Sequence, residues 1–485
     1  MKGIRIFWGL ILAAALVASG FVQSRLNQSR ESLGLTRTAV ISNAPPILAF
    51  TTVALGGFRG LIANALWIRT TEMQEDGKYF EAVQLADWIT KLQPHMTQVW
   101  VNQAWNMAYN ISVKFPDPEE RWLWVQRGIE LIRDEGLRYN PNQVLMFREL
   151  GWMFQHKMGA NLDDAHWLYK TRWAAMMEEV LPGGRLNPAE LTNSLSPEAI
   201  SRVKRLRETY KLDPVWLLDV DNRYGPLDWR LPEAHVIYWA TLGIKYSPAQ
   251  DQVPLRREIF QPMLATFHHG RVITNRFAKR IELAPNLDVV SKVSKAYEEA
   301  IAAEPDNADH FGRAHRNFLK DAVYFLYANN REKEARFWFE YIRKQYGIGE
   351  QSGIPEGSTM EDFALSKVTE DINETSRDRV TALLQGFITQ SFYYLALDDD
   401  DQSVGLDRIA QRIYANYRER TSLPGTVTRV ALPEMSEIKR NVLLDILTPD
   451  ANFNPEFQQV LRTKLRLPSD FGIPKTNSPT ATEPR

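Results

Sequence analysis

The sequence predicts an all-α protein: a solenoid of helical hairpins with an N-terminal transmembrane helix and an irregular central insert. Three observations lead to this fold class. Apolar residues recur every three or four positions through most of the chain, which is the period of an amphipathic helix. Alternating, strand-like runs are nearly absent. A fixed spacing between prolines and aromatic residues recurs along the chain, as expected for a helical repeat.

The first predicted element is a membrane anchor over residues 1–22. Residues 4–22 are apolar, carry no charge after Arg5, and are long enough as a helix to cover the roughly 30 Å hydrocarbon core of a bilayer. Lys2 and Arg5 precede the apolar run, so both a cleaved signal peptide and a retained anchor fit the pattern. We expect a retained, single-pass anchor, because the run is long for a signal peptide.

Residues 23–60 are predicted to form a linker and an apolar packing helix. The apolar stretch 46–68 is interrupted by Gly56, Gly57, Arg59 and Asn64. An arginine near the centre of a membrane span is costly. We therefore expect this stretch to pack under the first repeat, with contact to the membrane interface or a second crossing as the alternatives.

The first helical hairpins are predicted over residues 61–180. Gly77 and Tyr79 mark a turn between helices, Ala82 and Ala86 lie four residues apart, and Pro94 ends the second helix. Small alanines allow two helices to approach closely, and proline cannot continue a helix. The segment 77–94 therefore reads as the second half of a hairpin unit.

The same spacing of six residues between a proline and an aromatic residue recurs three times. The pairs are Pro94 with Trp100, Pro141 with Phe147, and Pro305 with Phe311. After the second proline, Phe147, Leu150, Gly151 and Phe154 fill a W-x2-L-G-x2-Y pattern with aromatic substitutions. A later unit, over residues 291–347, has Ala335 and Phe339 in an A-x3-F spacing.

These motifs resemble the tetratricopeptide (TPR) repeat. The resemblance covers about half of the chain and implies a helical-hairpin solenoid that binds partners. The 47 residues between Pro94 and Pro141 exceed the family period of about 34, so the helices between them must be longer than usual. The combination with an anchor is similar to membrane-anchored TPR-like proteins of bacterial envelopes, which implies a bacterial inner membrane with the bulk of the chain extracytoplasmic.

Between residues 181 and 290 the repeat signal disappears, and we expect an irregular insert with short helices. It contains the most distinctive string of the sequence, which brings together the polar, titratable and aromatic residues Asp228, Trp229, Arg230, Glu233, His235, Tyr238 and Trp239. One interpretation is a partner- or ligand-binding pocket. The other is that Asp228 pairs with Arg230 across a turn while His235 lies on the buried face of a helix. Beyond the last repeat we expect a loop over 348–376, helices over 377–467 and a disordered tail over 468–485.

Composition narrows the function. The 58 Lys and Arg residues balance 59 Asp and Glu residues, so no global charge favours nucleic acid. The absence of cysteine excludes thiolate metal sites and thiol nucleophiles. No nucleotide-binding or common hydrolase motif occurs, and no histidine pair has metal-ligand spacing. We therefore expect no enzyme activity, no cofactor and no metal.

The sequence leads to two functional hypotheses. The first is a membrane-anchored scaffold that mediates protein–protein interaction with a membrane-associated partner, in envelope transport or assembly. The second is a glycan-binding or glycan-processing envelope protein that uses the region from Asp228 to Trp239, since tryptophan rings stack on sugars.

Overall fold

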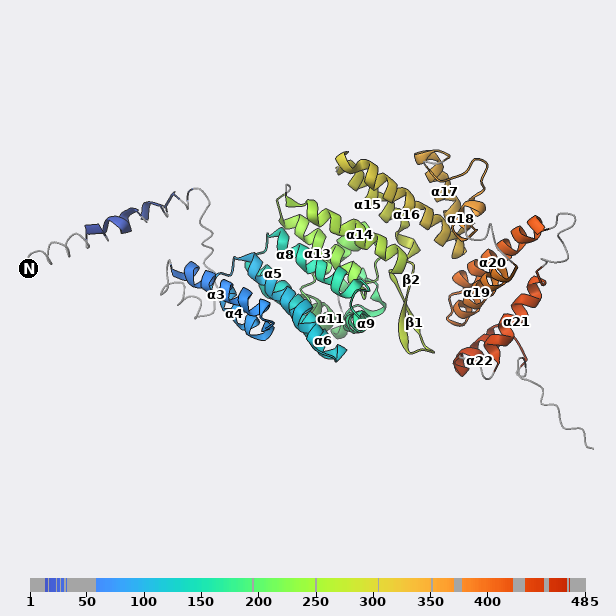
Figure 1. Cartoon of the computed structure of the whole chain (residues 1–485), viewed down its shortest axis with the longest axis horizontal. Helices are drawn as coiled ribbons and strands as arrows, with labels where there is room; N and C mark the ends of the chain where they lie inside the picture. Colours follow the sequence, from blue (N-terminus) through green and yellow to red (C-terminus); the bar gives the residue numbers. More distant parts are fainter. Residues whose placement is uncertain are drawn as a thin grey trace, which may run out of the picture.

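The computed structural model describes residues 58–468 except 194–195, 249–250, 304, 350–351, 370–376, 422–431 and 449–452, together with Phe471 and parts of 14–32. Helices dominate these residues, and their one sheet is a two-stranded hairpin. Figure 1 shows the elements following one another along the long axis of the molecule, from α3 and α4 at one end to α19–α22 at the other. The predicted all-α class is confirmed.

The predicted membrane segments fall largely outside this description. Residues 4–13 of the expected anchor and residues 46–57 of the second apolar stretch are not among the described residues. In the part of the chain that is described, no helix has both the length and the apolar character needed to span a bilayer.

The N-terminal helices pack as consecutive hairpins. They are α3 (Phe58–Glu75), α4 (Tyr79–Leu92), α5 (Thr97–Trp105), α6 (Pro118–Glu130), α7 (Leu137–Tyr139), α8 (Val144–Trp152) and α9 (His166–Glu178). The π-helical segments η1 (Asn106–Ile111), η3 (Leu131–Gly136) and η4 (Met153–Gly159) continue α5, α6 and α8, and the short 3-10 segment η2 (Ser112–Lys114) follows η1. The helices between Pro94 and Pro141 therefore run without a break over 97–114 and 118–139, which accounts for the long spacing between the two prolines.

Most of the residues expected to pack the repeat lie at helix contacts. Gly77 has a positive φ of 75° in the turn between α3 and α4, a conformation that favours glycine. The residues buried between helices are Ala82, Ala86, Trp100, Phe147, Leu150, Gly151, Phe154, Phe311, Ala335 and Phe339, whereas Tyr79 is half-buried and Pro141 and Pro305 are exposed. The six-residue spacing has a direct cause at its first occurrence: the indole Nε1 of Trp100 donates to the carbonyl oxygen of Pro94 at 2.9 Å.

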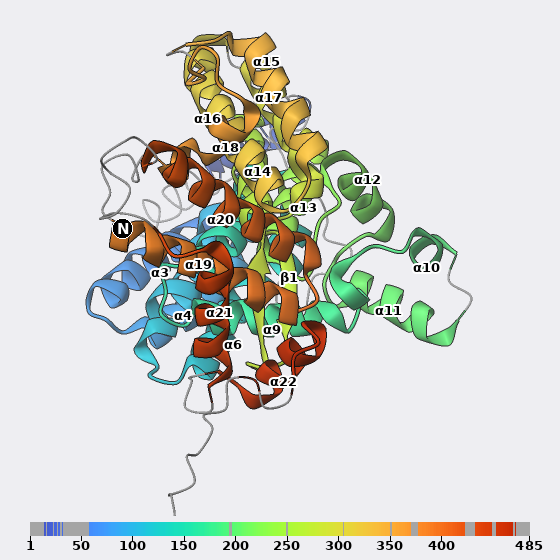
Figure 2. The same ribbon diagram turned by 90° about the vertical axis from the view of Figure 1, so that its right-hand side faces the viewer.

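The central region is more regular than its sequence indicated. Its elements are α10 (Pro188–Thr192), α11 (Pro197–Glu208), α12 (Pro214–Tyr224), α13 (Pro232–Tyr246), α14 (Val253–His269), β1 (Arg271–Asn275) and β2 (Arg280–Ala284). Figure 2 shows α10 and α11 projecting to one side of the body. In contrast, α13 packs against α8, η4 and α14 in the middle of the core, and most of its residues are buried. A helix buried on all faces has no amphipathic period, which is why the repeat signal is lost there.

Several helices begin with the same local signal, a short polar residue followed by proline. Asp117, Ser196, Asp213 and Asn454 each accept a hydrogen bond from a backbone N–H in the first turn of the helix that follows. Such a side chain satisfies a donor that the helix leaves unpaired, and proline is tolerated at the next position because its missing N–H would be unpaired there anyway.

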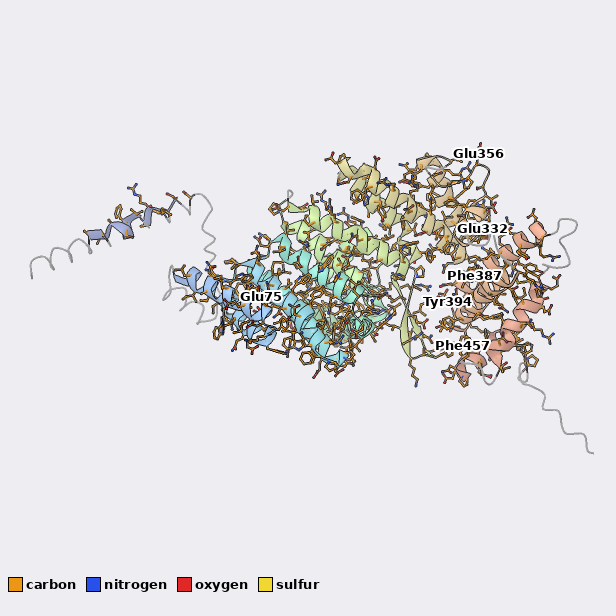
Figure 3. All side chains as sticks on the ribbon, in the orientation of Figure 1. Glu75, Glu332, Glu356, Phe387, Tyr394 and Phe457 are labelled. Carbon is orange, nitrogen blue, oxygen red and sulfur yellow. The ribbon has the colours of Figure 1, made fainter. Side chains whose placement is uncertain are left out.

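The C-terminal helices extend the same core. They are α15 (Val290–Ala303), α16 (Ala308–Ala328), α17 (Glu332–Tyr346), α18 (Met360–Thr369), α19 (Arg377–Ala396), α20 (Asp400–Thr421), α21 (Met435–Leu447) and α22 (Pro455–Lys464), with the short segment η7 (Leu287–Val289) before α15. Buried apolar residues from α5 to α22 form one contiguous cluster. In Figure 3, Phe387, Tyr394 and Phe457 mark the packing of α19 and α22 at the C-terminal end.

The β1–β2 hairpin joins the central helices to this C-terminal end. In its turn, the Phe277 ring meets the edge of Phe457 of α22 with centroids 5.4 Å apart. Arg271 of β1 forms an ion pair of 2.7 Å with Asp399, and Tyr393 of α19 donates to Glu282 of β2 at 2.8 Å. The hairpin thus contacts α19, α22 and the turn before α20.

Candidate functional site

The buried Asp228 and the partly buried Arg230 form an ion pair at the start of α13. Two nitrogens of Arg230, Nε and Nη2, donate to the two carboxylate oxygens of Asp228 at 2.8 and 2.7 Å. Asp228 also accepts from the backbone N–H of Val272 in β1, and Arg230 contacts Glu178 of α9 at 3.1 Å. The pair therefore ties the start of α13 to β1 and to the end of α9.

His235 lies in the hydrophobic core. Its side chain is 0% exposed, its Nε2 is 2.9 Å from the carbonyl oxygen of Trp229, and its ring stacks on Phe154 with centroids 5.2 Å apart. Burial lowers the pKa of His235 to about 4, so the ring is neutral at pH 7. It is thus positioned as a packing residue with one polar contact.

The aromatic residues of this region are buried as well. Trp229, Tyr238 and Trp239 are at most 3% exposed. The Tyr238 hydroxyl accepts from the backbone N–H of Asp213, and the Trp229 indole donates to Asp221. A sugar ring could stack on these faces only if α13 left the core.

A buried lysine, Lys170, lies near Glu233 of this region. Lys170 of α9 is 3% exposed, and its Nζ lies 3.0 Å from Asn161 Oδ1 and 2.9 Å from His166 Nδ1. Desolvation lowers the pKa of Lys170 and raises the pKa of Glu233. The opposite charge of each residue partly offsets the pKa shift of the other. The structure thus brings Glu233 toward Lys170, a neighbour that the sequence pattern did not indicate.

A groove of about 630 Å³ lies next to α13. It is lined by residues of α12, α13, α14 and α15 and by Phe311 of α16. Val220, Ile244, Ile259 and Phe260 supply apolar surface within it. This volume falls in the range of about 300–1,000 Å³ that is usual for ligand pockets.

The charges around the groove are predominantly positive. The cationic side chains are Arg223, Lys245, Arg256 and Arg257, against the acidic side chains Asp219 and Glu299. Arg223 of α12 and Glu299 of α15 form an ion pair of 3.3 Å, and Lys245 Nζ lies 4.3 Å from the ring centre of Trp216. The indole Nε1 of Trp216 is buried and has no hydrogen-bond partner. The groove therefore combines apolar surface with an excess of cations.

A second cluster places two buried acids close together. Glu149 of α8 accepts from the Trp105 indole at 2.8 Å, and Glu258 of α14 packs against Gly151 of α8. One carboxyl oxygen of Glu258, Oε2, is buried without a hydrogen-bond partner. Burial raises the pKa of Glu258 to about 8, and the negative charge of Glu149 adds to the shift.

Comparison with family models, with curated proteins and with solved structures finds no match for this chain. Among the described residues, no group of three His, Asp or Glu side chains is arranged to hold a metal ion. Functional inference therefore depends on the groove and on the two polar clusters.

Sequence reasoning missed the groove because its residues come from five helices. Two local signals were nevertheless present. Ala296, Ala300 and Ala303 recur at helical spacing on α15, and Arg256 and Arg257 are adjacent on α14. From the sequence alone, neither signal indicates that α14 and α15 line the same groove.

Proposed function

We propose that this protein is a helical scaffold that holds a partner protein by binding an amphipathic, acidic α-helix of the partner in the groove between α12 and α15. The observation that carries the proposal is the groove itself, whose lining from five helices combines apolar surface with four cations and two acids. Helix-in-groove binding uses this arrangement, in which apolar anchors enter the groove and charges at its edge fix the orientation.

The shape of the groove favours a helix as the occupant. Ala296, Ala300 and Ala303 line the α15 wall, and small side chains let another helix approach closely.

The charges favour an acidic partner. Arg256 and Arg257 are exposed on α14, and Lys245 lies beside Trp216. Carboxylates along the edge of the incoming helix would meet these cations, while a basic helix would be repelled.

We further propose that residues 4–22 anchor the scaffold in a bacterial inner membrane, with the helical body extracytoplasmic. The support is the uncharged apolar run of the sequence. Confinement to a membrane raises the effective concentration of a membrane-associated partner, so that a modest intrinsic affinity suffices.

Filling the groove should abolish binding. The probe is a fluorescein-labelled helical peptide with leucines on one face and glutamates beside them, titrated with the full chain in detergent and followed by anisotropy. In the Ala300→Trp variant the new indole occupies the space of the peptide side chains, so the Kd should rise at least about tenfold, the equivalent of losing one buried anchor.

The matched control is Ala302→Trp, two residues away on the exposed side of the same helix. It should bind like the wild type. A peptide in which lysines replace the glutamates should bind more weakly than the acidic one. The proposal is wrong if no form of the protein binds the acidic peptide, or if Ala300→Trp leaves its affinity unchanged. Direct binding of dodecanoate, weakened by Ala300→Trp and without any peptide binding, would instead identify the groove as a fatty-acid site.

A further inference from the structure

We propose that protonation of Glu258 regulates the groove: the neutral carboxyl holds α14 against α8, and its ionisation loosens α14 and weakens ligand binding. The part of this inference that concerns ligand binding depends on the proposed function. The part that concerns α14 stands on the helix packing alone.

Glu258 sits in a buried contact between two helices. It is 7% exposed, and Gly151 of α8 lies directly against it, so that a Cβ at position 151 would be 2.8 Å from Oε2. No hydrogen bond reaches this oxygen, and a buried carboxylate without a partner is costly, whereas the neutral acid is tolerated. The packing of α14 on α8 therefore favours the protonated form.

Burial is the largest cause of the raised pKa of Glu258. Of the neighbouring charges, Arg148 lowers this pKa, and Glu149 on α8 raises it by a smaller amount. Because desolvation raises the pKa of Glu258 to about 8 despite the opposing charge of Arg148, the carboxyl is mostly neutral at pH 7 and mostly ionised at pH 9.

The other elements packed against α14 bring no compensating cation to Glu258. Lys245 of α13 and Glu299 of α15 line the groove with other residues of α14. Asp288 of η7 is paired with Arg331, and Glu282 of β2 accepts from Tyr393. Glu258 thus responds mainly to Glu149, Arg148 and its own burial.

The same helix forms part of the groove. Arg257 and Ile259, the residues on either side of Glu258, both line it, as does Phe260. A shift of α14 away from α8 would therefore displace residues that line the groove. If only the neutral form binds, the affinity follows the protonated fraction of Glu258.

The test compares the wild type with Glu258→Gln, which mimics the neutral acid. Hydrogen exchange of α14 amides, corrected for intrinsic rates, is followed from pH 6 to pH 9.5 on the full chain. Binding of the acidic probe peptide is measured over the same range. The wild type should lose α14 protection, and its Kd should rise about tenfold between pH 7 and pH 9. Glu258→Gln should show neither change.

Glu149→Gln provides a second variant in case Glu258→Gln does not fold. Removing the charge of Glu149 lowers the pKa of Glu258, so the loss of α14 protection should begin at a lower pH. Identical pH dependence in the wild type and Glu258→Gln, or an unmoved transition in Glu149→Gln, would overturn the inference. If α14 protection changes as expected but the peptide binds at no pH, the helix contact is pH-sensitive and the proposed groove function is wrong.

Discussion

Buried histidines make stability depend on pH at the scale of single residues. His235 and His315 are almost fully buried, and burial lowers the pKa of each to about 4. In the unfolded chain the same groups take up protons near pH 6.5. Between pH 4 and pH 6.5 the unfolded state therefore binds more protons than the folded state. The contribution of these neutral, buried histidines to the free energy of unfolding is complete above about pH 6.5 and is lost as the pH falls toward 4.

For His235 this contribution amounts to at most about 3 kcal/mol, from a difference of roughly 2.5 pKa units. His235→Gln, which cannot take up a proton, should show a smaller loss of unfolding free energy between pH 7 and pH 4.5 than the wild type. Urea denaturation at both pH values measures this difference. His310→Gln, at an exposed position, is the control and should retain the wild-type pH dependence.

At the scale of elements, the close approach of α20 to α16 depends on one glycine. A Cβ at Gly405 would lie 1.8 Å from the carbonyl oxygen of Ala328 and 2.9 Å from the backbone nitrogen of Asn329. Both are backbone atoms at the end of α16, so a side chain at position 405 can be accommodated only by moving one helix relative to the other.

Gly405→Ala should therefore destabilise the protein by about 1–3 kcal/mol, the usual cost of overpacking a core contact. Gly386→Ala provides the comparison, because among the described residues no atom beyond its own helix backbone lies within 4 Å of its Cβ position on α19. That substitution should be neutral or stabilise by up to about 1 kcal/mol, since alanine favours helix more than glycine does. Equal effects of the two substitutions in thermal unfolding would contradict the close contact.

The sequence predicted the hairpins of the N-terminal half because local signals determine them. Two such signals are the hydrogen bond from the Trp100 indole to the Pro94 carbonyl oxygen and the left-handed turn at Gly77. Each depends on residues that lie close together in the sequence. The position of α13 was not predictable, since a helix that is apolar on all sides shows no preferred face. The β1–β2 hairpin was also missed. The residues that the hairpin contacts, Phe457 and Asp399, lie far from it in the sequence.

The candidate site was predictable only in part. Pairing of Asp228 with Arg230 follows from their spacing, and the structure contains that pair. In contrast, the approach of Glu258 to Gly151 and Glu149 joins helices more than 100 residues apart in sequence, so no local pattern could indicate it.

At the scale of the whole molecule, the contiguous core from α5 to α22 and the predicted anchor have separate roles. The core gives the body its shape, and the apolar run 4–22 is expected to decide where the body resides. Removing residues 1–22 should therefore leave the helical content measured by circular dichroism nearly unchanged.

The same deletion should move the protein from the membrane fraction, where it resists carbonate extraction, to the soluble fraction. Recovery of the full chain in the soluble fraction, still carrying residues 1–22, would refute the anchor. Recovery without these residues would identify a cleaved signal peptide instead. N-terminal sequencing distinguishes the two results.

The π-helical segments η1, η3 and η4 have a consequence for comparing this chain with any relative. A π turn contains about one residue more than an α turn, so each segment shifts the residues that follow by about 100° around the helix axis. A homologue that lacked one residue in such a segment would keep the length of the hairpin almost unchanged. Beyond that point, however, its helix would turn a different set of side chains toward the neighbouring helices. A single gap in an alignment would therefore indicate that the buried and exposed faces of the helix differ between the two proteins.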